Sequence, residues 1–505
     1  MRRASATVWA PVMTSVLLLS VLGCSRTAEQ AIPVPGEVPV ASPAAVQFAE
    51  DLRRRVTVDA MRVHLSKLQD IADQHGGNRA VGTPGYDASV EYAAGALREA
   101  GFDVQTPEFE VRTFSAEKPT LTVGGKEVDA DALKYTLATP PAGITAPLLA
   151  LPAGDAPGCV PADYDGMAVK GAVVLVDRGG CPFHAKQAVA AELGALALVV
   201  ADNVDEDFMP GTLGEDTDVK IPVVSVGKTD GARLRTASGP ATLRVEAVTQ
   251  NIKSRNVIAQ TRTGSTSDVV MVGAHLDSVP EGAGLNDNAS GVAAVLETAL
   301  ALGSSPQVRN AVRFALWGAE EVGLTGSKRY VQSLDVEALK DIALYLNSDR
   351  IASPNAGYFT YDGNQSTAVG RDQAIPRVPE GSAGIERTLV AYLDSQGKPA
   401  EDTFFDGRSD YDGFTTAGIP AGGLFAGAEE KMSAEQAEKW GGTADAPFDP
   451  DYHKGTDTLD RLNTEALRIH GGGVAFSVGR YAQDLHGRNG IPVREDRTRH
   501  PLPAY

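Results

Sequence analysis

Apolar runs and amphipathic stretches alternate regularly through the second half of the chain. Apolar runs at 267–274, 311–317 and 341–347 predict buried strands. Amphipathic stretches at 288–302 and 323–334 predict helices between these strands. Strands that alternate with helices form mainly parallel or mixed sheets with helices on both faces, so the pattern predicts an α/β domain.

An earlier part of the chain continues the same pattern. Residues 62–74 and 87–100 are amphipathic and predict two helices, and residues 102–111 alternate like a strand. The simplest account is a single discontinuous α/β domain that comprises residues 56–112 and 250–487.

The segment between these two parts, residues 113–249, has a different pattern. Short β-rich runs at 172–176, 195–200 and 221–226 flank a predicted helix near 184–193. The sequence of this segment contains no constellation of metal-binding residues. We therefore expect a smaller, β-rich domain inserted into the α/β domain.

The first 24 residues have the pattern of a targeting segment. Arg2 and Arg3 precede an apolar run at 8–22, and Cys24 directly follows Gly23. This ending resembles the bacterial lipobox, in which such a cysteine becomes the lipidated N-terminus. An uncleaved membrane helix is the alternative, but the apolar run falls short of the ~20 residues that cross a bilayer. The resemblance implies a lipid anchor on the outer face of the cytoplasmic membrane, with release from the cell as a second outcome.

Two further segments show no hydrophobic periodicity. Residues 25–55 are rich in Ala, Val and Pro, a composition typical of an extended tether. Residues 488–505 are basic and contain Pro, and we expect a loose tail there.

The net charge of the chain bears on the kind of molecule that it binds. The chain of 505 residues has 46 Lys and Arg against 65 Asp and Glu, a formal charge of −19. Proteins that bind nucleic acid present basic faces, so nucleic acid is not an expected partner. An apolar content of 43% in a chain of this length is typical of a soluble protein with more than one domain.

The chain contains three cysteines: Cys24, Cys159 and Cys181. If Cys24 is acylated, the other two remain as a pair in an oxidising compartment, where disulfides persist. Two cysteines without histidines at zinc-finger spacing do not make a structural zinc site, so a disulfide is the better interpretation.

Metal-binding residue types follow the three strands predicted in the second half of the chain. His275 ends the first strand, Glu320 and Glu321 follow the second, and Asp349 follows the third. A single such residue is more often a satisfied core or capping residue. Side chains beyond the carboxyl ends of neighbouring strands, however, lie where open α/β sheets bind ligands. Because all of these residues follow strands of the same predicted sheet, we expect them to form a single site.

Two turn residues complete the set. Asp287 stands in the Gly-rich segment 282–291, where its alternative role is to cap the following helix, and His453 lies in a late loop. Two imidazoles and three carboxylates can hold two divalent ions with one carboxylate shared, while a fourth carboxylate acts as base. The imidazoles favour zinc over calcium. Asp277, two residues after His275, can orient the imidazole.

These motifs resemble those of peptidase family M28, the co-catalytic zinc aminopeptidases. The resemblance is carried by His275-Leu276-Asp277-Ser278, Gly284-Leu285-Asn286-Asp287-Asn288, Trp317-Gly318-Ala319-Glu320-Glu321 and Tyr452-His453. It implies a three-layer α/β/α zinc peptidase domain with a mixed sheet, and an enzyme that removes N-terminal residues from peptides with free N-termini. It also implies a cis peptide bond between Asp287 and Asn288.

The resemblance assigns metal ligands to residues of this chain. It implies that His275 and Asp349 hold one zinc ion, that Glu321 and His453 hold a second, and that Asp287 bridges them.

It also assigns roles in the reaction. Glu320 would be the general base, Tyr452 would polarise the scissile carbonyl, and Arg408 would orient the substrate. Arg350 stands where relatives have Met, and we expect it to shift the substrate side-chain pocket away from purely apolar residues.

The inserted segment resembles the protease-associated (PA) domain. The resemblance is carried by Gly180-Cys181-Pro182-Phe183, Lys186 and Ile221-Pro222-Val223-Val224. It implies a disulfide between Cys159 and Cys181, and we expect the domain to control access to the catalytic cleft.

Other functions remain open on the same pattern. A carboxypeptidase or a single-zinc glutaminyl cyclase can be built on a similar fold, although Asp287, Glu321, Tyr452 and Arg408 favour the aminopeptidase. The alternative from another class is a non-catalytic binding lipoprotein that descends from a hydrolase. Such proteins usually lose metal ligands or the general base, and this chain retains both.

Overall fold

The structure is a computed structural model that describes residues 42–154, 158–204, 211–215, 217–367, 377–486 and 490–503. The expected signal segment, Cys24 and the first part of the expected tether lie outside the described residues. Within the described ranges, no helix combines the length and the apolar character needed to cross a membrane.

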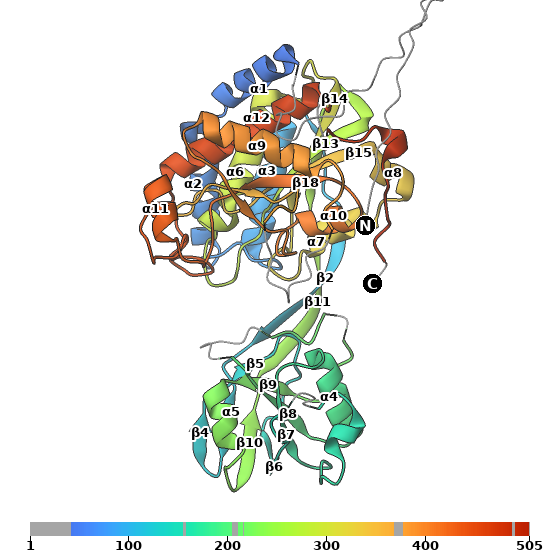
Figure 1. The fold of residues 1–505 in the computed structure, drawn as a ribbon, viewed down its shortest axis with the longest axis vertical. Helices are drawn as coiled ribbons and strands as arrows, with labels where there is room; N and C mark the ends of the chain where they lie inside the picture. The colour runs from blue at the N-terminus through green and yellow to red at the C-terminus, as the bar shows by residue number, and fades with distance from the viewer. Residues whose placement is uncertain are drawn as a thin grey trace, which may run out of the picture. The chain divides into compact units, whose positions relative to one another are not determined.

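The α/β part is built on an eight-stranded mixed sheet, as the sequence predicts (Figure 1). Its three central pairs, β14–β13, β13–β15 and β15–β18, are parallel, while the strands toward both edges include antiparallel pairs. In spatial order the strands are β1 (Asp103–Gln105), β12 (Val257–Gln260), β14 (Asn310–Trp317), β13 (Ser265–His275), β15 (Ile342–Ser348), β18 (Ala421–Phe425), β16 (Phe359–Tyr361) and β17 (Glu401–Thr403).

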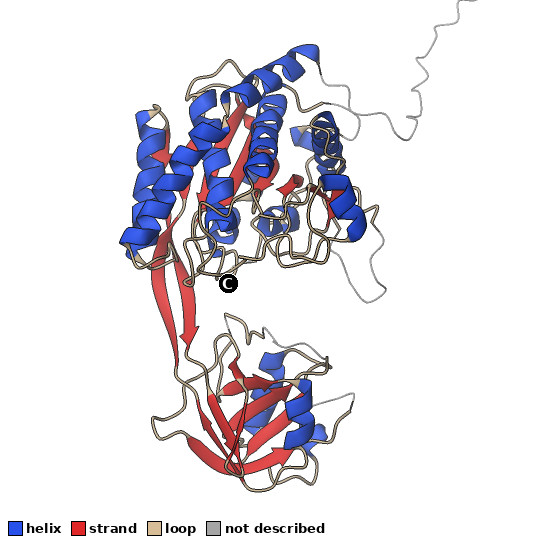
Figure 2. Cartoon of the chain, turned by 90° about the vertical axis from the view of Figure 1, so that its left-hand side faces the viewer, coloured by secondary structure: helices blue, strands red, loops and turns tan. Residues whose placement is uncertain are grey.

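Helices cover both faces of this sheet and give it three layers (Figure 2). Alternate residues of β13 show why: Val270 and Val272 belong to one apolar core, while Met271 belongs to the core on the opposite face. The first core includes residues of α2 (Val58–Gln74), α3 (Pro84–Glu99), α6 (Gly291–Leu302), α9 (Ser382–Ser395) and α12 (Thr464–Gln483). The second includes residues of α7 (Thr325–Gln332), α8 (Val336–Asp341) and α10 (Tyr411–Thr416). Helix α11 (Ala434–Trp440) follows β18.

The inserted part has its own β-rich fold. Its sheet has the order β4 (Lys126–Val128), β3 (Thr120–Val123), β10 (Pro240–Arg244), β6 (Ile144–Ala150), β7 (Val173–Asp177), β8 (Ala197–Ala201), β9 (Val223–Val226) and β5 (Asp131–Ala132). The helical elements are η1 (Pro161–Tyr164), α4 (Phe183–Glu192) and α5 (Lys228–Leu234). The apolar strands β7 and β8 contribute to two separate cores, because they are buried on both faces. This arrangement confirms a β-rich inserted region.

A two-stranded antiparallel ribbon leads into and out of the insertion. It consists of β2 (Glu108–Ala116) and β11 (Ala247–Arg255). The pairing runs along the whole ribbon, from Glu108 opposite Arg255 to Ala116 opposite Ala247. The chain therefore enters and leaves the insertion at paired positions.

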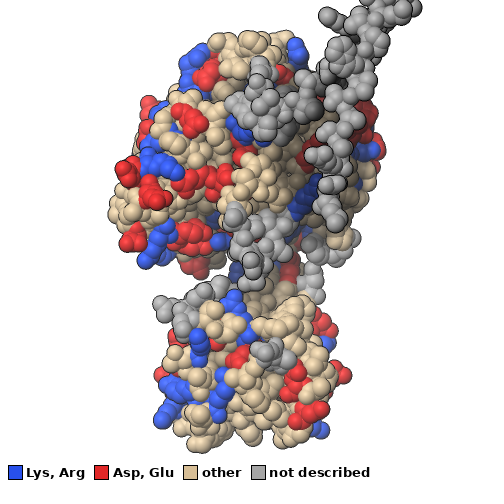
Figure 3. Space-filling model, viewed as in Figure 1, with Lys and Arg blue, Asp and Glu red and all other residues tan. Residues whose placement is uncertain are grey.

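The surface carries both signs of charge. On the face shown in Figure 3, acidic and basic side chains are interspersed over the described residues.

Residues 43–55 form helix α1 (Pro43–Arg55), so the expected tether is wrong for this segment. The side chain of Ser42 accepts a hydrogen bond from the backbone N–H of Ala45, and Pro43 occupies the first turn. Ala45, Ala49 and Leu52 recur at helical spacing and are buried. The backbone of Ala49 approaches Gly479 of α12 so closely that a Cβ there would clash. Small side chains that suggested a linker instead permit close helix packing.

The expected loose C-terminal tail is also wrong for residues 490–503, which include η3 (Arg494–Asp496). The Arg497 guanidinium donates to the carbonyl oxygens of Ser267 (2.9 Å) and Lys340 (2.7 Å). Arg499 donates to the carbonyl oxygens of Leu339 (3.2 Å) and Ile342 (3.0 Å). The basic residues of the tail satisfy backbone carbonyls beside the sheet, which a sequence pattern does not reveal.

Candidate metal centre

The five expected metal ligands come together at the carboxyl ends of the parallel strands. His275 is the last residue of β13, Asp349 follows β15, and Glu321 lies in the turn after β14. Asp287 lies in the short irregular helix η2 (Leu285–Ser290) that precedes α6. His453 comes from the loop between α11 and α12.

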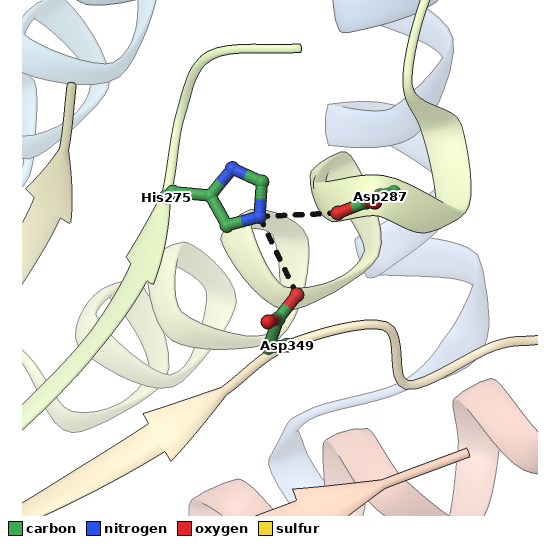
Figure 4. Close-up of side chains that lie close together, drawn as sticks. All are labelled: His275, Asp287 and Asp349. Atoms are coloured by element: carbon green, nitrogen blue, oxygen red, sulfur yellow. Dashed lines mark hydrogen bonds and ion pairs between the residues drawn. The ribbon is translucent and has the colours of Figure 1, made fainter. Parts of the chain in front are cut away.

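One group of ligands surrounds His275 (Figure 4). Its Nε2 atom lies 3.1 Å from Asp287 Oδ1 and 3.4 Å from Asp349 Oδ1. All three residues are buried, with Asp349 only 1% exposed. We call this group the His275 half of the centre.

A second group surrounds His453 and shares Asp287. The Nε2 atom of His453 lies 3.2 Å from Asp287 Oδ2 and 3.1 Å from Glu321 Oε2. The side chain of His453 is 38% exposed. In this group, the His453 half, Asp287 presents the oxygen that does not face His275, which is the geometry of a carboxylate that bridges two ions.

The chemistry of these atoms fits zinc. Asp287 Oδ2, Glu321 Oε1 and Asp349 Oδ1 are buried and accept no hydrogen bond from the described residues, although histidine nitrogens lie 3.2 Å and 3.4 Å from the two aspartate oxygens. Buried carboxylate oxygens without partners are costly, so a cation that takes their lone pairs satisfies them. Asp287 and Glu321, working against burial, raise the pKa of His453 to about 10, which shows how strongly the cluster attracts positive charge. Imidazole nitrogens combined with carboxylate oxygens suit zinc.

Glu320 lies next to both halves. Its Oε2 atom is 4.0 Å from His275 Nε2, and the residue is buried. Burial, together with the charges of Glu321 and Asp349, raises the pKa of the Glu320 carboxyl well above its usual range, although His275 opposes the shift. A carboxyl of this kind is suited to accept and return a proton.

Asp277 makes hydrogen bonds with residues of both halves of the centre. Its carboxylate accepts hydrogen bonds from the backbone N–H groups of Glu320 (3.1 Å) and Glu321 (3.3 Å). His275 Nδ1 donates a hydrogen bond to the backbone carbonyl oxygen of Asp277 at 3.1 Å, whereas the Asp277 carboxylate lies 3.8 Å from the same nitrogen. The residue therefore orients the imidazole mainly through its backbone, and its side chain fixes the turn that carries both glutamates.

Sequence reasoning missed two positioning residues. The buried guanidinium of Arg79 donates to the carbonyl oxygens of Leu276, Ala283 (3.0 Å) and Gly284 (2.9 Å), which flank the ligand loops. The carboxylate of Asp457 accepts from the backbone N–H groups of Asn286 (2.7 Å) and Asp287 (3.1 Å). These contacts join positions far apart in the chain, so a local sequence pattern does not reveal them.

The peptide bond between Asp287 and Asn288 is cis, as the resemblance implies.

Tyr452 lies beside His453 with its hydroxyl between two arginines. The two rings stack with centroids 3.8 Å apart. Arg408 Nη2 and Arg350 Nη1 donate to the Tyr452 hydroxyl oxygen at 3.3 Å and 3.4 Å. Burial raises the pKa of Tyr452, although Arg350 and Arg408 oppose the shift, so the phenol keeps its proton at neutral pH. Since guanidinium groups only donate, the phenol proton is available to a third group.

Arg350 contacts the ligand carboxylates as well as Tyr452. Its Nη2 atom lies 3.0 Å from Asp349 Oδ2, and its Nη1 atom lies 3.5 Å from Asp287 Oδ2. The guanidinium carbon lies 5.4 Å from the ring centroid of Phe425 and 5.3 Å from that of Tyr452. The residue is only 7% exposed, so its charge acts within the centre.

The inserted part contains the disulfide between Cys159 and Cys181 that the sequence predicts. Cys159 lies just before η1, and Cys181 lies just before α4.

Comparisons with known proteins agree with this geometry. The model of peptidase family M28 matches residues 256–478, and the PA domain model matches residues 144–234. The "Probable lipoprotein aminopeptidase LpqL" of Mycobacterium tuberculosis is 64% identical over 97% of this chain and 98% of its own length. An aminopeptidase of Pseudomonas aeruginosa is 41% identical over 86% of this chain and 83% of its own length.

Two solved structures share the fold. An aminopeptidase from Aneurinibacillus sp. strain AM-1 is 27% identical, with a TM-score of 0.68 over 86% of this chain and 96% of its own. A zinc aminopeptidase from Bacillus subtilis is 25% identical, with a TM-score of 0.63 over 88% of this chain and 99% of its own.

Proposed function

The chain belongs to peptidase family M28, and from this premise we propose that it is a membrane-anchored, extracellular di-zinc aminopeptidase. One observation carries the proposal. Asp287 presents one oxygen to His275 and the other to His453, and the buried Glu320 lies beside both halves. This arrangement supports two ions that share a carboxylate, with a base within reach of the space between them.

The ligands divide between two ions. His275 and Asp349 would hold one ion, Glu321 and His453 the other, and Asp287 both. When bound, the zinc ions lower the pKa of a shared water and stabilise negative charge on the scissile carbonyl oxygen.

Glu320 takes a proton from the attacking water and returns it to the leaving amine. The raised pKa of its carboxyl brings it closer to the working pH, which favours transfer in both directions. Asp277 keeps Glu320 in place through the backbone of the turn. Glu320 therefore acts on the substrate and Asp277 acts through Glu320.

Tyr452 and Arg408 act on the peptide. The phenol O–H of Tyr452 donates a hydrogen bond to the scissile carbonyl oxygen. Arg408, which donates to the same phenol oxygen and is half exposed, orients the substrate. The free amine of the substrate binds among the carboxylates of the centre, which restricts cleavage to the first residue.

The location of the enzyme follows from its N-terminus. The relative from Mycobacterium tuberculosis is named a lipoprotein, and we extend this property to the present chain through lipidation of Cys24. The peptidase domain then comprises residues 56–112 and 250–487, and the PA domain at 113–249 controls access of peptides to the cleft.

The test is hydrolysis of leucine p-nitroanilide by the protein without residues 1–24, before and after chelation and return of zinc. We expect activity to disappear with the chelator, to return with zinc, and to be absent in Glu320→Ala. Asp277→Asn is the matched variant: it should lower activity less, because Glu320 remains. N-acetylation of a peptide should abolish its cleavage. Cleavage of the acetylated peptide, or full activity in Glu320→Ala, would contradict the proposal.

Arg350 is the proposed determinant of side-chain preference. Its charge beside Tyr452 favours first residues that are not purely apolar. We therefore expect Arg350→Met and the parent protein to differ in the order of their hydrolysis rates on leucine, arginine and glutamate anilides. The same order in both proteins would exclude this role.

A further inference from the structure

Arg350 places a permanent positive charge among the metal ligands. A guanidinium does not lose its proton in proteins, so it competes as a cation at every working pH. Its contacts with Asp349 Oδ2 (3.0 Å) and Asp287 Oδ2 (3.5 Å) involve two of the three ligand carboxylates. The same two carboxylates must neutralise any divalent ions that the centre binds.

We propose that Arg350 competes with zinc for Asp349 and Asp287 and so sets the free zinc concentration at which the centre fills. The proposal rests on the proposed function for the identity of the ligands. Two physical effects support it. The hydrogen bond from the guanidinium to Asp349 and its ion pair with Asp287 reduce the negative charge that these carboxylates offer to an ion. The guanidinium also repels the ions in a buried site where solvent screens little.

The opposite expectation is that Arg350 orients the ligands, because partners behind metal ligands usually do so. Loss of such a partner typically weakens metal binding by about 10–100-fold. Here other residues already supply the orientation. Ser409 Oγ donates to the same oxygen of Asp349 at 2.7 Å, and Asn347 Nδ2 donates to Ser409 at 2.8 Å. Asp457 holds the backbone of Asp287. Removal of Arg350 therefore removes charge while these contacts remain.

The surroundings of Arg350 suggest a substitution that preserves packing. The rings of Phe425 and Tyr452 lie near the guanidinium at distances typical of cation–π contacts. Methionine fills a similar volume and also packs well against aromatic rings, so Arg350→Met removes the charge with little loss of packing.

The experiment measures zinc binding without substrate. Full-length protein, purified in detergent, is equilibrated with zinc at free concentrations fixed by a chelator, and bound zinc per chain is determined by elemental analysis. We expect Arg350→Met to half-fill at roughly tenfold lower free zinc than the parent, and Arg350→Lys, which keeps the charge, to stay near the parent. Equal or weaker zinc binding by Arg350→Met would overturn the proposal.

Arg408→Met is the matched control. Arg408 donates to the same Tyr452 hydroxyl but is half exposed, and its ion pairs are with Glu429 and Glu430 rather than with ligand carboxylates. Its removal should leave zinc binding unchanged, and a shift equal to that of Arg350→Met would also overturn the proposal.

Two further measurements keep the outcome decisive. If Arg350→Met does not fold, as judged by near-UV circular dichroism, Arg350→Gln removes the same charge and decides the question. Zinc binding is measured without turnover, so the two proposals can be told apart. If the parent protein does not hydrolyse leucine p-nitroanilide, the proposed function is contradicted, while tighter zinc binding by Arg350→Met than by the parent still supports the inference.

Discussion

The two halves of the metal centre are built from different kinds of structure. In the His275 half, His275 and Asp349 stand at the ends of two paired parallel strands and are almost fully buried. In the His453 half, Glu321 lies in a turn, and His453 lies in a loop with a backbone φ of 54° and a half-exposed side chain.

This difference suggests that the two halves of the centre have different roles, one in stability and one in catalysis. Strand ends are held by the sheet and by the cores on both of its faces, so the His275 half provides a rigid base. The loop of the His453 half places His453 where solvent reaches its side chain, which is 38% exposed. We therefore expect the His275 half to be coupled to folding and the His453 half to be coupled mainly to catalysis.

The largest expected effect contrasts the two histidines. His275→Ala and His453→Ala should each lower activity more than about a hundredfold, because each removes a proposed metal ligand. His275→Ala should also destabilise the fold by about 3–5 kcal/mol, because it leaves fully buried carboxylates without their partner. His453→Ala should destabilise the fold less, because the His453 side chain is 38% exposed and water can reach the carboxylates that it leaves. Urea unfolding with a chelator present measures both values, and equal destabilisation would break the comparison.

An intermediate effect contrasts two arginines. Arg79 satisfies three carbonyl oxygens of buried loops around the His275 half, so Arg79→Met should destabilise the fold by about 3 kcal/mol. Arg461 lies in the loop that carries His453, pairs with Asp451 and is 47% exposed, so Arg461→Met should destabilise the fold less than Arg79→Met. Unfolding in urea checks both. A cost for Arg461→Met as large as that for Arg79→Met would show that the loop is as tightly coupled to folding as the strand ends.

The smallest expected effect concerns acid. His470 donates through Nδ1 to the carbonyl oxygen of Ile351, two residues beyond Asp349, and burial lowers its pKa to about 4. The unfolded chain, with a pKa near about 6.5, takes up the proton first as the pH falls. Stability that is present above about pH 6.5 is therefore lost toward pH 4, about 2 kcal/mol of it by pH 5.

The control for this effect is His470→Gln, which keeps a donor for Ile351 but does not titrate. Urea unfolding at pH 7.5 and pH 5 with a chelator present should show a smaller loss in the variant than in the parent. The same loss in both proteins would place the acid sensitivity elsewhere.

The sequence predicted the parts of the fold that depend on local pattern. The runs that end at His275, Trp317 and near Asp349 form β13, β14 and β15, and the mixed sheet is confirmed. His275, Glu321 and Asp349 could be recognised as candidate ligands because metal-binding residue types directly follow buried strands there, whereas Asp287 and His453 lie outside the strands and were recognised from the motifs that contain them. Cys159 and Cys181 form the expected disulfide.

The parts that could not be predicted depend on contacts between distant segments. Helix α1 is stable because Ala45, Ala49 and Leu52 find a partner surface, and its Ala- and Pro-rich sequence alone resembles a linker. Arg497 in the tail and Arg79 act on backbone carbonyls more than 150 residues away along the chain. A carbonyl acceptor leaves no signature in the sequence, because every residue has one.

The ribbon of β2 and β11 has a consequence for the history and engineering of this protein. Its first and last residues, Glu108 and Arg255, are paired, so the peptidase part is closed by an ordinary hairpin whatever the ribbon carries at its far end. The entropy of closing a loop grows only slowly with its length, so an insertion at this place costs the host little. We therefore expect that the inserted region can be replaced, or shortened to a tight turn between β2 and β11, without a change in the sheet that carries the candidate metal centre.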